Sequence, residues 1–157
     1  MFDDAPFELH GPWSHDEVDR FLAQTVIPLR IGVVTPSEWP LVLSLWFVPV
    51  GGELLAATRP TSTLIRCLES RPRCGFEVAG DTPPYRGIRG RAEVVLDHAA
   101  GGATLDLLLQ RYLGGTTSPL AERLRLDGSN EVCLRLRPVT ITSWDYRARM
   151  ASSLEGP

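Results

Sequence analysis

The apolar residues of this chain recur mostly with the two-residue period of β-strands, in short runs separated by turn residues. Gly51 and Gly52 alone separate two of these runs, which is typical of a tight hairpin. The predicted strands cover residues 26–35, 41–50, 53–58, 73–79, 87–96, 131–138 and 139–146. About six strands with short connections favour a small closed barrel over a parallel sheet with crossover helices.

Short helices are predicted where the spacing becomes helical or where a capping residue precedes an apolar run. They are 14–24 with a capping box of Ser14 and Glu17, 62–70 with Thr61 or Ser62 as cap, 103–113, and 118–124 with Ser118 as cap. The fold class is therefore mainly β (α+β), an antiparallel barrel with short flanking helices.

The strand over 41–50 is apolar on both faces, unlike an antiparallel strand with one side in water. Leu43, Leu45 and Phe47 share one face, and Val42, Ser44, Trp46 and Val48 share the other. We expect one face to fill the barrel, and a partner chain or a ligand to cover the other.

The 157 residues, 43% of them hydrophobic and 22% charged, suit one soluble domain over 1–157. Residues 1–13 are expected to form an arm and 147–157 a short tail. No apolar run is long enough to span a bilayer, and the acidic start lacks the features of a signal peptide. We therefore expect a cytoplasmic protein that does not bind membranes, and its net charge of −3 disfavours nucleic acid as a partner.

All 16 basic residues are arginines, so a Schiff-base lysine and a P-loop lysine are both excluded. Any anion must be held by arginines, hydroxyl groups and backbone N–H groups. The cysteines, Cys67, Cys74 and Cys133, contain no CxxC pair, so the sequence predicts neither a disulfide framework nor a metal site. Their apolar neighbours predict buried free thiols, which disfavours a thiol enzyme.

The corner between a strand and a helix at residues 58–66 is the best candidate for binding chemistry. Free N–H groups at the start of a helix, hydroxyls and arginines together can hold a phosphate. The residues in question are Thr58, Arg59, Thr61, Ser62, Thr63 and Arg66. Taken alone, the segment is better explained as an ordinary corner with a capped helix and solvated arginines.

A second candidate is "PPYRGIRGR" at 83–91, where Tyr85 and Arg86 precede a strand. These side chains could stack on a flat ligand and hold an anion, or they could line a solvated strand face. Trp46 and the aromatic residues of 143–146 could flank a ring system or pack in the core.

Taken together, the segments resemble the pyridoxamine 5′-phosphate oxidase-like, FMN-binding split-barrel superfamily, over residues 27–149. They occur in the order typical of that family: "PLVLSLWFV", "LLAATRPTSTLIRCLESRPRCGFEV", "PPYRGIRGRAEVV", "LLLQRYLGG" and "EVCLRLRPVTITSWDY". The resemblance implies a six-stranded split barrel that forms a homodimer with two FMN sites between the subunits.

The same resemblance implies roles for individual residues. The backbone of Leu45, Trp46 and Phe47 would lie along the isoalloxazine edge, and Ala57 and Thr58 would lie near the ribityl phosphate. Tyr85 and Arg86 would reach the flavin across the interface.

Two departures from the family pattern matter. Many members hold the phosphate with an Arg-Lys pair, whose positions are Thr63 and Leu64 here. Arg59 or Arg66 could replace the pair, and Arg59 is the better placed because it lies at the strand end, whereas Arg66 lies one helical turn in. After Tyr146 only a short tail follows, so we do not expect the vitamin B6 reaction, which needs an additional C-terminal segment.

These observations lead to a homodimeric FMN-dependent oxidoreductase that transfers hydride at flavin N5 to or from a small molecule. No catalytic residue is identified, although Tyr85 is a candidate proton donor. A deazaflavin is the alternative cofactor. Two other hypotheses are a non-catalytic flavin-binding module and a small barrel that binds nucleic acid through Arg89 and Arg91, which the acidic balance disfavours.

Overall fold

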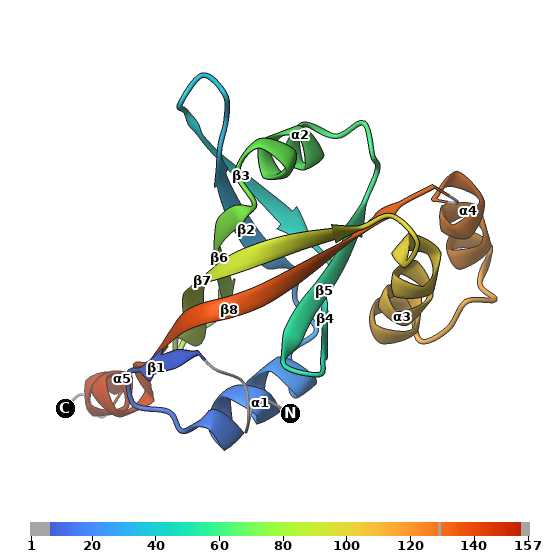
Figure 1. The fold of residues 1–157 in the computed structure, drawn as a ribbon. Coiled ribbons are helices and arrows are strands. Elements are labelled where there is room, and N and C mark those ends of the chain that lie inside the picture. Colours follow the sequence, from blue (N-terminus) through green and yellow to red (C-terminus); the bar gives the residue numbers. More distant parts are fainter. Residues whose placement is uncertain (1–6, 129, 155–157) are drawn as a thin grey trace.

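The strands of the chain form one curled, largely antiparallel sheet (Figure 1). The structure, a computed structural model, describes residues 7–128 and 130–154, and this part of the chain contributes eight strands to the sheet. The strands are β1 (Glu8–His10), β2 (Leu29–Val34), β3 (Pro40–Leu45), β4 (Val48–Val50), β5 (Glu53–Thr58), β6 (Arg73–Ala79), β7 (Arg86–Asp97) and β8 (Val132–Asp145). Their order is β3-β2-β6-β7-β8-β5-β4, with β1 beside β8, so the sheet does not close. The predicted mainly β split barrel is confirmed.

The sheet has eight strands among the described residues, where a six-stranded barrel was expected, and the strand bounds differ in detail from the predicted ranges. The apolar run 41–50 breaks at Trp46 and Phe47, because β3 pairs with β2 whereas β4 pairs with β5. Residues 131–146 form one long strand, β8, instead of two. The expected arm contains β1, which pairs in parallel with β8. Residues 1–6 of that arm lie outside the described residues.

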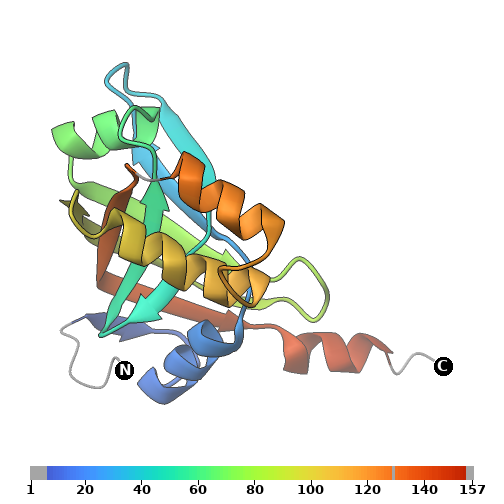
Figure 2. The same ribbon diagram turned by 90° about the vertical axis from the view of Figure 1, so that its right-hand side faces the viewer.

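The core lies on the inner face of the sheet, and two short helices cover its ends. The fully buried strand residues include Leu29, Ile31, Leu54, Val78, Ile88 and Ile141. Helix α2 (Thr63–Ser70) covers one end with Leu64, Ile65 and Leu68, and α1 (His15–Gln24) covers the other with Val18 and Leu22 (Figure 1). Helices α3 (Gly101–Leu113) and α4 (Pro119–Asp127) lie together outside the sheet near β5 (Figure 2).

The helix starts follow the predicted caps. The Ser14 hydroxyl accepts a hydrogen bond from the backbone N–H of Glu17, and the Glu17 carboxylate accepts one from the backbone N–H of Ser14. Of the two residues proposed to cap α2, Ser62 is the cap, since its hydroxyl accepts from the N–H of Ile65 at 3.2 Å. Ser118 caps α4 in the same way. The expected tail includes a further helix, α5 (Arg147–Leu154), while 155–157 lie outside the described residues.

Two other predictions are confirmed. Gly51 and Gly52 form the hairpin turn with φ angles of 57° and 82°, which glycine adopts without strain. All three cysteines are buried free thiols, and burial raises the pKa of Cys74 to about 12, so its thiolate is not available as a nucleophile. None of the helices in the described part of the chain is long and apolar enough to cross a bilayer.

Candidate functional site

The strand pairing of the barrel is interrupted between β3 and the last residues of β5. These two edges, Pro40–Leu45 and Ala56–Thr58, are called the split below. Strand β4 covers β5 only from Glu53 to Leu55, and β3 has β2 on one side, so the described residues place no strand along either remaining edge. Backbone N–H and C=O groups at a free strand edge can bind a polar ligand edge. Leu45, Ala57 and Thr58, three of the predicted site residues, border the split.

Trp46 and Phe47 connect β3 to β4. Both side chains pack against other residues of the same chain. The Trp46 ring stacks on Tyr112 of α3, with ring centroids 4.8 Å apart and planes inclined by 7°. The Phe47 side chain is fully buried, and the Arg111 guanidinium lies over its ring at 5.1 Å. Their side chains therefore pack internally, and a ligand at the split would meet their backbone.

The end of α3 fixes this connection in place. The Tyr112 hydroxyl accepts a hydrogen bond from the N–H of Phe47 at 3.3 Å and donates one to the carbonyl of Ile27 at 2.9 Å. Burial raises the pKa of Tyr112, which keeps the hydroxyl protonated as a donor. Arg111 donates to the carbonyls of Leu22, Ala23 and Thr25 at the end of α1, where helix carbonyls lack partners.

The corner between β5 and α2 brings hydroxyls and charge to a helix N-terminus. Ser62 uses its oxygen as the cap and keeps its hydrogen free to donate. The Arg66 guanidinium donates to the Thr63 hydroxyl at 2.9 Å, so it reaches back to the first turn of α2. Across the described residues, the hydroxyls of Thr58 and Thr61 make no hydrogen bond. The Arg66 charge therefore lies beside the start of the helix, and which of Arg59 and Arg66 binds a phosphate stays a prediction.

Arg59 lies opposite a carboxylate. Thr58 pairs with Val132, so Arg59 and Glu131 occupy facing positions just beyond the paired strands. Burial raises the pKa of Glu131, and the charge of Arg59 acts against that rise. Arg59 is thus less free to bind an anion than its position in the sequence suggests.

Tyr85 and Arg86 lie far from the phosphate corner within one chain. Arg86 begins β7, whereas Asp97 at the end of β7 pairs with Cys133, next to the partner of Thr58. Eleven strand steps of about 3.3 Å separate Arg86 from Asp97, so Arg86 lies on the order of 30 Å from the corner. It borders a hollow with Trp13, Arg20 and Arg147 at the far end of the barrel.

Comparison with known proteins supports the fold assignment. No protein-family model matches the chain, and no curated protein matches it. Among solved structures, a conserved hypothetical protein of Mycobacterium tuberculosis, Rv2991, has a TM-score of 0.76 at 21% identity over 88% of this chain and 89% of that protein. An F420 reductase has a TM-score of 0.66 at 23% identity over 83% and 97%. A Listeria innocua protein named for pyridoxamine 5′-phosphate oxidase has a TM-score of 0.62 at 14% identity over 84% and 97%.

The fold is that of the pyridoxamine 5′-phosphate oxidase-like split barrels. The TM-scores of 0.62 to 0.76 establish this fold. At identities of 14 to 23%, the ligand and the reaction have to be argued from the residues of this chain.

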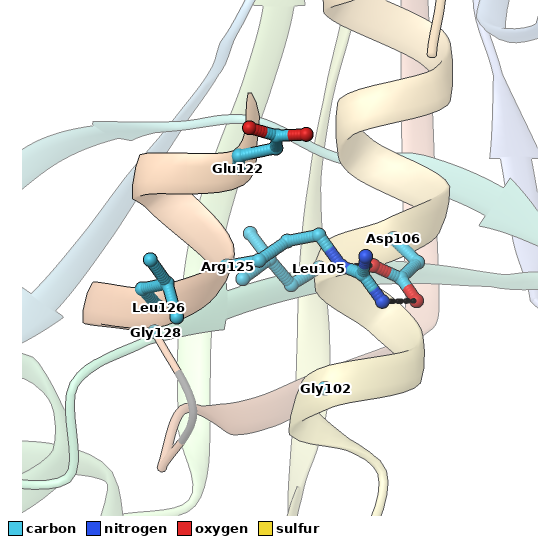
Figure 3. A pocket seen from close by; sticks show the side chains of 7 residues that line it. All are labelled: Gly102, Leu105, Asp106, Glu122, Arg125, Leu126 and Gly128. Carbon is cyan, nitrogen blue, oxygen red and sulfur yellow. Dashed lines mark hydrogen bonds and ion pairs between the residues drawn. The ribbon is translucent and has the colours of Figure 1, made fainter. Parts of the chain in front are cut away.

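A second hollow lies between α3 and α4 (Figure 3). Its volume is about 530 Å³, and Leu105, Leu126 and Glu122 are among the residues that line it. The Arg125 guanidinium crosses toward Asp106, with Nε 2.7 Å from the carboxylate. These two charges satisfy each other, so the hollow is a poorer candidate for an anionic ligand than the corner.

The sequence analysis assigned no role to three residues near the site: Arg111 and Tyr112, which it contained only within the segment "LLLQRYLGG", and Glu131. The helical spacing of 103–113 indicated that Tyr112 is inward-facing and said nothing of its hydroxyl partners. Glu131 becomes visible as the neighbour of Arg59 once strands 53–58 and 131–138 are aligned, and that alignment is a property of the folded sheet.

Proposed function

We propose that this protein is an oxidoreductase that binds a flavin-type cofactor, FMN or a deazaflavin, at the split of a homodimer. The observation that supports this most directly is the arrangement of two free strand edges, of which that of β5 leads into a corner with hydroxyls, helix N–H groups and Arg66. A flat polar ring fits the strand edges, and a phosphate fits the corner.

The residues divide between the two ends of such a cofactor. The backbone of Leu45, Trp46 and Phe47 would contact the ring edge, supported from behind by Tyr112. Ala57, Thr58, Thr61, Ser62, Thr63 and Arg66 would hold the phosphate, with Arg59 nearby. A bound flavin or deazaflavin supplies the hydride-accepting ring, and the protein orients it and excludes water.

The separation of the predicted site residues supports a homodimer. Tyr85 and Arg86 lie far from the corner of their own chain, so we assign their contribution to the site of a second subunit. The β2–β3 hairpin, which projects beyond the barrel, carries exposed apolar side chains that a partner would cover (Figures 1 and 2). Trp39 is 73% exposed and Val42 is 65% exposed. Tyr85 of the second subunit is then the candidate proton donor.

The reaction is hydride transfer to or from a small molecule in the cytoplasm, where buried thiols such as Cys67 stay reduced. The shared fold of an F420 reductase favours a deazaflavin as the second candidate cofactor. A non-catalytic flavin carrier is the remaining alternative, and turnover distinguishes it from an enzyme.

The test is the absorption spectrum of freshly purified protein, followed by mass analysis of any compound that heat releases. The expected result is a flavin or deazaflavin spectrum with one cofactor per subunit. Reduction by NAD(P)H with rapid transfer to a dye supports the enzyme over the carrier. A haem spectrum, or a colourless protein that takes up neither FMN nor a deazaflavin on titration, contradicts the proposal.

A further inference from the structure

The charge available at the corner is smaller than its two arginines suggest. Arg59 follows β5 and Glu131 precedes β8, and the pairing of Thr58 with Val132 sets the two residues opposite each other. Opposite charges at facing positions of neighbouring strands attract. The Glu131 charge therefore offsets that of Arg59.

Glu131 is held in this position by its surroundings. Its backbone carbonyl lies directly against Gly101, and its carboxylate oxygen Oε1 lies near Gly128, where an added Cβ would be 3.2 Å away. The side chain is half-buried, and the charge of Arg59 opposes the effect of that burial on its pKa. The carboxylate therefore lies beside the end of α4, within electrostatic reach of Arg59.

The next carboxylate along the strands does not change this charge balance. Asp97 accepts hydrogen bonds from the N–H groups of Ala99 and Ala100 and lies 3.8 Å from Arg135. With Asp97 paired in this way and Arg59 offset by Glu131, Arg66 is the cation of the corner that forms no ion pair among the described residues.

We propose that Glu131 is a specificity-determining residue that makes the corner favour a singly charged phosphodiester over a doubly charged phosphomonoester. The inference rests on the proposed function and names the class of cofactor phosphate. A phosphomonoester carries nearly two negative charges above neutral pH, because its second pKa is about 6, whereas a phosphodiester carries one. A net charge of one at the corner matches the diester, and Glu131 repels the second charge of the monoester.

Three ligands that share one ring system and differ in the charge of their phosphate are compared. They are riboflavin, FMN and riboflavin 4′,5′-cyclic phosphate. Their affinities are measured by flavin fluorescence at about pH 8, where carboxylates are ionised. The variant is Glu131→Gln, which keeps the shape and removes the charge. Glu122→Gln, on the exposed side of α4, is the matched control. Circular dichroism checks that each variant is folded.

The wild-type protein should bind the cyclic phosphate at least as tightly as FMN. Glu131→Gln should raise the affinity for FMN about tenfold, that for the cyclic phosphate about threefold, and that for neutral riboflavin not at all, since the Coulomb energy scales with ligand charge. Glu122→Gln should change none of them. An unchanged FMN affinity, or an equal change for riboflavin, overturns the role of Glu131 while the proposed function stands. If the wild-type protein binds none of the three ligands and no deazaflavin, the proposed function fails as well.

Discussion

Arg59 and Arg66 are separated by only six residues, yet they face different surroundings. Arg66 reaches the first turn of α2, and Arg59 faces Glu131. We expect Arg66→Ala to weaken FMN binding at least tenfold, which is typical for the loss of a charged hydrogen bond. The charge-neutral double variant Arg59→Ala/Glu131→Gln should stay within about threefold of the wild type. Isothermal titration measures both, and a larger loss in the double variant would assign the phosphate to Arg59.

Asp145 joins three parts of the molecule at the far end of β8. It accepts hydrogen bonds from the Trp13 indole at 3.2 Å and from the Arg147 side chain and backbone. The Arg147 hydrogen bonds lower the pKa of Asp145 from 3.8 to about 2. A depressed carboxyl pKa stabilises the folded state above the unfolded-state pKa, and this contribution is lost as the pH falls through the folded-state value.

Asp145→Asn should therefore lower the free energy of unfolding by roughly 1–2 kcal/mol at neutral pH, allowing for the exposure of Arg147 to solvent. The difference from the wild type should shrink between about pH 4 and about pH 2. Urea unfolding at a series of pH values measures it. Asp81→Asn, in an exposed loop, is the control and should change stability by less than about 0.5 kcal/mol. A difference that persists unchanged at the lowest pH would rule out the ionised carboxylate as its source.

At the scale of elements, α3 supports the connection between β3 and β4 through one hydroxyl group. Tyr112→Phe keeps the stack on Trp46 but leaves the carbonyl of Ile27 and the N–H of Phe47 without their partner. We expect a loss of about 1–2 kcal/mol in the free energy of unfolding. Tyr146→Phe, at a residue 44% exposed, should have almost no effect. Equal stability of the two variants would mean that α3 does not depend on this hydroxyl.

Elements with local signals were predictable from the sequence. Ser14, Ser62 and Ser118 cap their helices because a short hydroxyl side chain can accept from a backbone N–H three residues on. The turn at Gly51-Gly52 requires positive φ angles, and glycine signals them. The alternation of the strands likewise gave the antiparallel barrel.

Features that depend on distant partners were not predictable in the same way. Residues 41–50 are apolar apart from Ser44, so no residue marks the point where the chain stops pairing with β2 and begins to pair with β5. The parallel pairing of Leu9 with Ile141 joins residues more than 130 positions apart. At the candidate site, the residues of 58–66 were proposed from their types. The orientation of Arg66 and the pairing of Arg59 with Glu131 depend on helix and sheet geometry.

At the scale of the whole molecule, the proposed homodimer makes the β2–β3 hairpin an interface. Val42 is 65% exposed in the single chain, so Val42→Asp should leave the barrel folded while placing a charge in the apolar contact. We expect sedimentation analysis to find a monomer with reduced cofactor binding. Leu126→Asp, at a residue 79% exposed on α4, should remain a dimer. A Val42→Asp variant that sediments as the wild type does would place the interface elsewhere.

Sites shared between subunits predict recovery of binding when two damaged subunits are combined. Arg66→Ala damages the corner, and Arg86→Ala damages the segment that we expect to reach the partner's corner. A mixed dimer of these two variants has one site with both defects and one site with neither, because the two-fold axis makes each site from one corner and one Arg86.

Random assembly makes about half of the dimers mixed, so about a quarter of all sites should be intact. When the two variants are coexpressed so that mixed dimers form, about a quarter of the sites should therefore bind FMN. The FMN concentration is chosen so that each variant alone binds almost none. A mixture of Arg66→Ala with Ala57→Leu is the control and should recover nothing, since both changes damage the same half of the site. If Arg66→Ala with Arg86→Ala also recovers nothing while mixed dimers form, Arg86 acts within its own subunit or has no part in the site. The separation of about 30 Å between Arg86 and the corner would then exclude it from the cofactor site altogether.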